Sequence, residues 1–323
     1  MGLSKIKVGV IGVGYLGRYH AEKYANMANV ELVGLADIHT GRVQEIAENL
    51  HTRMFTDYHE LMKLVDAVSI VVPTKEHFKV AMDCLEYGLD ILIEKPISTT
   101  IAEADAIVAT AASCQRIVQV GHIERFNPAI LAMEQYIDEP IFIEAHRLHA
   151  FNPRGTDVDV TLDLMIHDLD IIMSIVKSPI KQIHAIGSSV VTDTSDLANA
   201  RLIFENGCSA NLTASRVSKT NTRKLRIFQR KSYISLDFNK KEIWISKQTS
   251  GKKGNFSEGK TDLFSFADQD ALETELKAFI LNVQQRARPL VSAVEGRLAL
   301  KTALQIIELI KTFSLEHQEL LSS

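Results

Sequence analysis

Three glycines between an apolar run and a helical stretch constrain the fold of this chain more than any other feature. Gly12, Gly14 and Gly17 have GxGxxG spacing directly after the strand-like run at 5–11, and Asp37 ends the next apolar run. A strand, a glycine turn, a helix and a second strand form a βαβ unit. Its glycines permit a tight turn and close approach of a pyrophosphate, which the helix N-terminus attracts. The pattern predicts a dinucleotide-binding site.

The acid after the second apolar run bears on which dinucleotide binds. Asp37 should accept hydrogen bonds from an adenosine ribose and repel a 2′-phosphate, so we expect NAD. Arg42 follows closely in the sequence and keeps NADP as an alternative. Tyr15 and Leu16 complete the glycine loop, and we expect them to contact the cofactor with it.

Alternation of strands and helices continues beyond this unit. Apolar runs at 67–72, 90–93 and 117–120 are separated by helical stretches. Helical stretches of about 10 to 15 residues between strands predict a parallel sheet covered on both faces. We therefore expect an α/β fold that begins with a doubly wound Rossmann domain at 1–122.

The texture of the sequence changes after the first domain. β-branched runs joined by short turns recur from 141 to 247 and predict a large, mostly antiparallel open sheet. A Gly/Ser/Lys-rich stretch at 249–260 is typical of a mobile loop, and amphipathic helices are expected at 270–286 and 293–313. Residues 123–323 thus form an expected α+β domain for substrate binding and oligomerisation, whose C-terminal helix can pack back on the first domain.

Composition limits the partners and the compartment. The 36 Lys and Arg are interspersed with 40 Asp and Glu, and the net charge is -4, which argues against nucleic acid. No run reaches the roughly 18 apolar residues of a membrane span. The three cysteines are scattered and the N-terminus lacks a secretory pattern, so we expect reduced thiols and a cytoplasmic protein.

A charged tripeptide ends one of the buried runs. Glu94-Lys95-Pro96 follows Ile93, and proline disfavours the helical basin for the residue before it, so Lys95 should be extended at the carboxyl end of a strand. Ligands bind at that edge of open α/β sheets. Taken alone, Lys95 is more simply a solvated lysine at a turn. Its position downstream of the glycine loop makes it a candidate contact for cofactor and substrate.

Other residues are expected along the same edge. Pro73 and Thr74 end the neighbouring apolar run and would border the nicotinamide half of the cofactor. His77 follows three residues later and fits a satisfied structural histidine as well as a cofactor contact. We also assign Glu94 and His122 to the cofactor site.

An acid and a histidine lie four residues apart on the helix expected at about 161–176. Asp163 and His167 can meet at this spacing, and a carboxylate fixes the tautomer of an imidazole and raises its basicity, as a general base requires. Many such pairs are purely structural. With Lys95 they form a candidate acid–base trio from two domains. A third ligand at zinc-like spacing is missing from the sequence, so we expect no metal.

These motifs together resemble the glucose-fructose oxidoreductase/inositol dehydrogenase (Gfo/Idh/MocA) family of two-domain NAD(P)-dependent sugar oxidoreductases. The resemblance spans nearly the whole chain and includes, besides the motifs above, Gly121-His122, Arg125-Phe126-Asn127-Pro128 and Glu295-Gly296-Arg297. It implies that Lys95, Asp163 and His167 carry catalysis. Residues 121–128 and 214–218 look most similar to the branch of nucleotide-sugar 3-dehydrogenases that act on UDP-N-acetylglucosamine.

The resemblance implies oxidation of a secondary sugar hydroxyl, expected at C3 of a UDP-N-acetyl-hexosamine. His167, held by Asp163, would take the hydroxyl proton while hydride passes to the nicotinamide, and Lys95 would stabilise the oxygen. Arginine matches phosphate geometry. Arg125, Arg147, Arg154 and Arg216 are therefore expected substrate contacts, and we also expect Asn127 to contact the substrate.

Other functions fit the same sequence. The scaffold would also suit a free polyol, aldose or diol, or an elimination or glycoside cleavage with tightly held NAD. A non-catalytic dinucleotide-binding regulator is a further alternative, although the presence of both Lys95 and His167 favours an enzyme. Val190, Leu202 and Leu212 lie on apolar strands, which suggests a sheet face covered in a homodimer or homotetramer.

Overall fold

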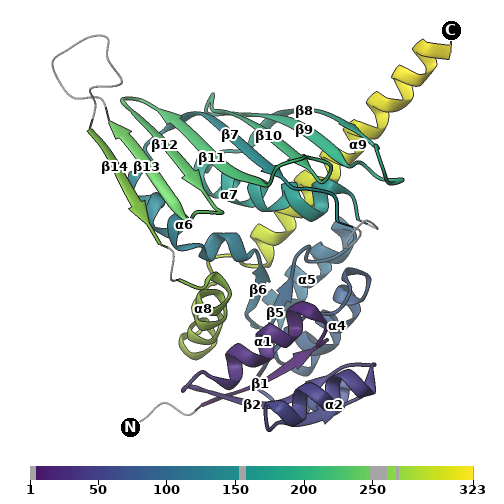
Figure 1. The fold of residues 1–323 in the computed structure, drawn as a ribbon. Coiled ribbons are helices and arrows are strands. Elements are labelled where there is room, and N and C mark those ends of the chain that lie inside the picture. The colour runs from purple at the N-terminus through teal and green to yellow at the C-terminus, as the bar shows by residue number, and fades with distance from the viewer. Residues whose placement is uncertain (1–4, 153–157, 248–259, 267–268, 323) are drawn as a thin grey trace. The chain divides into compact units, whose positions relative to one another are not determined.

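The computed structural model describes residues 5–152, 158–247, 260–266 and 269–322 (Figure 1). The loop expected at 249–260 lies outside the described residues up to its last position, where a strand begins. The chain divides into two compact units. One consists of residues 1–123 and 270–300, and the other of residues 124–269 and 301–323.

The first unit contains the parallel sheet that the alternating pattern predicts. Its six strands run in the order β3-β2-β1-β4-β5-β6, and all of their pairings are parallel. The strand order reverses between β1 and β4, so the ligand crevice of such a sheet lies at their carboxyl ends. The strands are β1 (Ile6–Ile11), β2 (Val30–Ala36), β3 (Arg53–Phe55), β4 (Ala67–Ile70), β5 (Asp90–Glu94) and β6 (Val118–Gly121).

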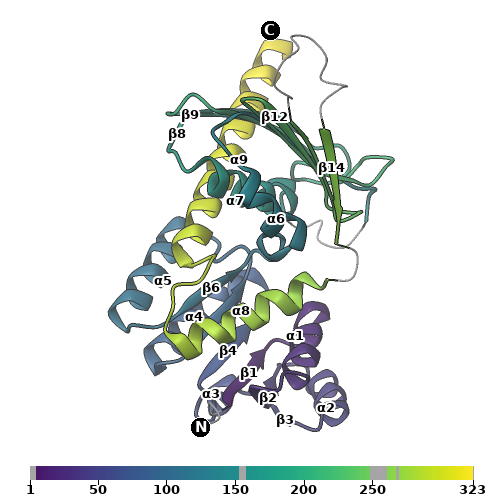
Figure 2. The ribbon, with the colours of Figure 1, turned by 90° about the vertical axis from the view of Figure 1, so that its left-hand side faces the viewer.

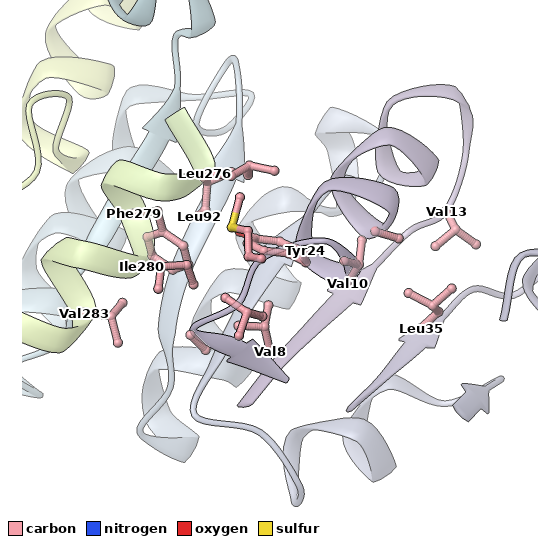
Figure 3. Packing of buried hydrophobic residues seen from close by; sticks show 14 of the residues in the cluster. Val8, Val10, Val13, Tyr24, Leu35, Leu92, Leu276, Phe279, Ile280 and Val283 are labelled. Atoms are coloured by element: carbon pink, nitrogen blue, oxygen red, sulfur yellow. The ribbon is translucent and has the colours of Figure 1, made fainter. Parts of the chain in front are cut away.

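Helices cover this sheet, and one of them comes from the far end of the chain. Leu276, Phe279 and Ile280 of α8 belong to the same buried core as Val8 of β1 and Tyr24 of α1 (Figure 3). The C-terminal region thus completes the core of the first unit. The helices of this unit are α1 (Tyr15–Ala25), α2 (Thr40–Asn49), α3 (Tyr58–Met62), α4 (Thr74–Tyr87), α5 (Ile101–Ser113), α8 (Ala271–Gln285) and the first part of α9 (Ala293–Ser322).

The second unit contains an eight-stranded sheet in the order β14-β13-β12-β11-β7-β10-β9-β8. Most neighbours are antiparallel, as predicted, but β7 lies between β11 and β10 and pairs with β10 in parallel. The strands are β7 (Pro140–Leu148), β8 (Ile180–Ser188), β9 (Leu197–Phe204), β10 (Ser209–Ser215), β11 (Thr222–Gln229), β12 (Ser232–Asp237), β13 (Glu242–Lys247) and β14 (Lys260–Ser265).

Helices α6 (Pro128–Met133) and α7 (Ile166–Val176) lie on one face of this sheet (Figure 2). The helix predicted at 161–176 forms, but its first five residues, Thr161–Met165, are a π-helix. Short π-helical segments are rare and occur often at functional sites. The irregular turn contains Asp163 and leads directly into the turn that contains His167.

The apolar residues that are exposed on the second sheet are not the ones expected from the sequence. Leu202 and Leu212 are only 0% and 1% exposed, because their side chains belong to the buried face of the sheet. They therefore give no evidence for a subunit contact, and the prediction from them is wrong. Val190 is 61% exposed but lies beyond the end of β8, not on a strand. The exposed large apolar residues on β11, β13 and β14 are Phe228, Trp244 and Leu263. Within the described residues, no helix is long and apolar enough to cross a membrane.

Candidate active site

The glycine loop joins β1 to α1, and its three glycines are needed for different reasons. Gly12 has a φ of +88°, and a Cβ there would lie 2.5 Å from the carbonyl oxygen of Val71. A Cβ on Gly17 would overlap the carbonyl oxygen of Gly12, so glycine is what lets α1 pack this closely. Around Gly14 the nearest atom to such a Cβ is Nη1 of Arg42, at 3.6 Å. The backbone at Gly14 is therefore open to a ligand.

Asp37 directly follows β2 and holds the glycine loop in place. Its Oδ2 accepts a hydrogen bond from the amide of Val13 at 2.9 Å, and its Oδ1 accepts one from the amide of His39 at 2.8 Å. Each carboxylate oxygen has a second lone pair, so both can still accept from a ribose diol. The residue thus fits an adenosine ribose while it supports the loop.

A cavity of about 810 Å³ runs along the carboxyl edge of the parallel sheet. Three strand spacings of roughly 4.8 Å separate β2 from β5, so its two ends lie about 14 Å apart. This length and the open backbone at Gly14 fit an extended dinucleotide. The lining includes these predicted residues: Gly12, Gly14, Tyr15, Leu16, Asp37, Arg42, Pro73, Thr74, His77, Glu94 and Lys95.

Two residues of the predicted cofactor set are not among the lining residues. Gly17 is buried where α1 packs against the loop, and His122 is 1% exposed behind the end of β6. Gly17 therefore acts through the shape of the loop. His122 stays a proposal.

His77 has a structural role in the wall of the cavity. The ring is 1% exposed, with Nδ1 2.8 Å from the carbonyl oxygen of Pro96 and Nε2 2.9 Å from that of Val72. Burial lowers the pKa of His77, although both carbonyls favour the charged ring. The imidazole thus ties the turn after Lys95 to the end of β4. The Lys95–Pro96 peptide bond is cis.

Glu94 is the last residue of β5 and has a partner that the motif analysis missed. One of its carboxylate oxygens lies 3.2 Å from Nε2 of His20, whose side chain is 1% exposed. A Cβ on Gly121 would meet the same carboxylate at 2.9 Å, so glycine there leaves room for it. The signal for His20 is its place on the buried face of α1, between Gly17 and Tyr24.

Asp163 and His167 lie in the second unit, both half-buried. They are about one turn apart on the continuous helical segment formed by the π-helix and α7. Their catalytic role stays a proposal.

Two predicted substrate arginines are buried in ion pairs. Arg147 donates from Nη2 to Asp168 at 2.7 Å and from Nη1 to Glu124 at 2.8 Å, and its side chain is 4% exposed. Burial opposes its charge, but these carboxylates outweigh burial and raise the pKa of Arg147. Arg216 donates from Nε to Asp196 at 2.8 Å. These pairs give no support for a phosphate-binding role of either arginine.

The other predicted substrate contacts are also placed. Nη1 of Arg125 lies 3.5 Å from Asp170, and both side chains are buried. Asn127 caps α6, because its side-chain oxygen accepts a hydrogen bond from the amide of Ala129 at 3.1 Å. Arg154 lies outside the described residues.

Comparisons with known proteins match both parts of the chain. Residues 6–122 match the family model described as "Oxidoreductase family, NAD-binding Rossmann fold", and residues 131–235 match "GFO/IDH/MocA C-terminal domain". A UDP-N-acetylglucosamine 3-dehydrogenase from Acidithiobacillus ferrooxidans is 38% identical over 95% of this chain and 98% of its own. A solved structure under that enzyme name, from the same organism, has a TM-score of 0.90 at 37% identity and covers 96% of this chain and 99% of its own.

More distant relatives have other named substrates. A myo-inositol 2-dehydrogenase from Thermotoga maritima is 25% identical over 91% of this chain and 93% of its own. A levoglucosan dehydrogenase solved with NADH and levoglucosan has a TM-score of 0.87 at 17% identity, over 96% of this chain and 98% of its own. This last likeness shows the fold alone.

Proposed function

The chain belongs to the GFO/IDH/MocA oxidoreductase family, and we propose that it oxidises a secondary sugar hydroxyl, most specifically C3 of a UDP-N-acetyl-hexosamine. One observation carries the substrate: the relative named UDP-N-acetylglucosamine 3-dehydrogenase is 38% identical across 95% of this chain and 98% of its own. The cavity at the sheet edge supports the cofactor half of the reaction.

NAD is the cofactor of this proposal. The glycine loop would hold the diphosphate at the N-terminus of α1, and Asp37 would bind the adenosine ribose. Pro73, Thr74 and Lys95 would border the nicotinamide, which accepts hydride when the cofactor is bound. NADP is the alternative, because Arg42 lines the same cavity beside Gly14.

Side chains of the protein remove the proton from the substrate hydroxyl and stabilise the charge that remains. The imidazole of His167, oriented by Asp163, removes the proton from the reacting hydroxyl. The ammonium of Lys95 stabilises the negative charge that develops on that oxygen. Both neighbours of Lys95 have contacts of their own: the side chain of Glu94 with His20, and the carbonyl oxygen of Pro96 with the ring of His77.

A free polyol is the second candidate substrate. It is favoured by the relative named myo-inositol 2-dehydrogenase, which is 25% identical over 91% of this chain. A non-catalytic dinucleotide-binding regulator is the third reading. It would not need both Lys95 and His167.

A substrate screen separates these proposals. The protein is mixed with NAD and, in separate reactions, UDP-N-acetylglucosamine, free N-acetylglucosamine and myo-inositol, and the absorbance of reduced nicotinamide is followed. We expect reduction with the nucleotide sugar and little with the other two. Faster reduction with myo-inositol would favour the polyol enzyme. Binding of NAD without reduction by any of the three would favour the regulator.

We propose that the protein is a cytoplasmic homo-oligomer that pairs through the open face of its second sheet. Phe228 contacts both Phe142 and Tyr233 there, with ring centroids 5.7 and 4.9 Å apart. Trp244 and Leu263 are paired residues of neighbouring strands and are 45% and 51% exposed. Trp244→Glu should shift the protein toward monomer in sedimentation analysis. A monomeric wild-type protein would contradict the proposal.

A further inference from the structure

Two carboxyl groups interact electrostatically near Lys95, and one of them lines the cavity. Glu94 lines the cavity, and its side chain is 14% exposed. Glu275 of α8 is 0% exposed, and neither of its carboxyl oxygens has a hydrogen-bond partner among the residues that the structure describes. A buried carboxylate without a partner is costly, so such a group takes up a proton instead.

The environments of the two carboxyl groups shift their pKa values in opposite directions. Burial, and then the charge of Glu94, raise the pKa of Glu275 well above its usual range. Burial also acts to raise the pKa of Glu94, but the nearby His20 and Lys95 outweigh it and leave that pKa below its usual range. The two shifts favour the neutral form at Glu275 and the carboxylate form at Glu94.

We propose that the carboxylate of Glu94 sets the relative affinity of the site for oxidised and reduced dinucleotide, while Glu275 stays neutral behind it. The nicotinamide ring is cationic in the oxidised cofactor and neutral in the reduced one. A fixed anion at this end of the cavity stabilises the oxidised form selectively. The inference rests on the proposed function, since it requires that the cavity holds a dinucleotide.

The geometry around Glu94 keeps its charge in place. His20 lies against one carboxylate oxygen at 3.2 Å, and Gly121 leaves the space that the carboxylate fills. His20 is therefore a positioning residue for Glu94. Glu94 itself contacts the cofactor in this proposal.

The test compares dissociation constants of NAD⁺ and NADH, measured by calorimetry for the wild-type protein and for Glu94→Gln. The ratio of the NAD⁺ constant to the NADH constant should rise about tenfold in the variant, with most of the change in NAD⁺. Glu275→Gln is the matched control, because it makes the same carboxyl-to-amide change at the neutral neighbour. Its ratio should stay within about twofold of the wild-type value.

Several results would overturn the inference. One such result is an equal loss of affinity for both dinucleotides in Glu94→Gln, and another is a change of the ratio in Glu275→Gln as large as that in Glu94→Gln. If Glu94→Gln does not fold, His20→Gln carries the test, since it keeps the charge of Glu94. In His20→Gln, the ratio of the NAD⁺ to the NADH dissociation constant should stay the same or fall. A rise of this ratio would contradict the inference. Binding of neither dinucleotide by the wild-type protein would overturn the proposed function together with the inference.

Discussion

The carboxyl edge of the parallel sheet and the buried face of the second sheet contain charged residues in opposite settings. At the parallel edge, Asp37, Glu94 and Lys95 stand at strand ends and line a cavity. In the second unit, Arg147 lies within a strand, at the same alternation as the buried Ala145, and is enclosed by carboxylates. A charge at a strand end is available to a ligand, whereas a charge pointing inward from a strand must be paired within the fold.

Substitution of the proposed catalytic residues tests this contrast with the largest expected effect. Lys95→Met and His167→Ala should each lower turnover by roughly 10³-fold, because each removes a group that acts on the reacting oxygen. Thermal unfolding should stay near the wild-type value, and both variants should still bind NAD. Turnover within about tenfold of wild type in either variant would contradict the assigned roles.

Removal of one partner from the buried ion pair should instead affect stability. Asp168→Asn leaves the charge of Arg147 partly uncompensated in the interior, so we expect a loss of about 3 kcal/mol in the free energy of unfolding, measured with urea. Glu144→Gln is the matched control. It breaks the half-exposed pair with Arg226, N to O 3.0 Å, and should cost less than about 1 kcal/mol. Equal losses in the two variants would remove the distinction between buried and exposed pairs.

Two glycines of one loop should respond differently to the same added methyl group. Gly17→Ala overlaps the carbonyl oxygen of Gly12 and should cost about 2 kcal/mol of stability by overpacking. Gly14→Ala meets little in the protein and should leave the unfolding free energy within about 0.5 kcal/mol. It should still weaken dinucleotide binding, because the methyl group occupies the open approach. Unchanged binding in Gly14→Ala would place the diphosphate elsewhere.

Glu275 should contribute to the pH dependence of stability. Burial and the charge of Glu94 raise the pKa of Glu275. Glu275 in turn interacts electrostatically with Tyr24. Between the usual and the raised pKa, the folded state binds one more proton than the unfolded state, so stability falls as pH rises, by up to about 1.4 kcal/mol per pH unit. Glu275→Gln should remove this slope. Parallel curves for the two proteins would show that Glu275 is ionised in the fold.

The sequence predicted most of the fold because glycine turns and apolar periodicity are local signals. It missed β3 and β14, which are edge strands with charged or polar residues and little alternation, and β3 has only three residues. The family resemblance was confirmed by the matches to both family models. The residues that line the cavity could be predicted because most of them lie at or near the carboxyl ends of the predicted strands.

Partners across the fold were harder to predict. The guanidinium groups of Arg147 and Arg216 were expected to bind phosphate, but the choice between phosphate and carboxylate depends on contacts with distant residues. Glu275 did leave a signal, since it lies three residues after Leu272 and four before Phe279, on the apolar face of its helix. An acidic residue in that position indicates a buried carboxyl group, either ionised or protonated.

In the proposed reaction, hydride leaves a ring carbon of a nucleotide sugar for the nicotinamide of a bound dinucleotide. UDP-N-acetylglucosamine that carries deuterium at C3, mixed with NAD⁺ and the wild-type protein, reveals this transfer. We expect reduced cofactor that contains the deuterium, formed more slowly than with the unlabelled sugar. Reduced cofactor without deuterium, or no reduction by a protein that binds both compounds, would contradict it.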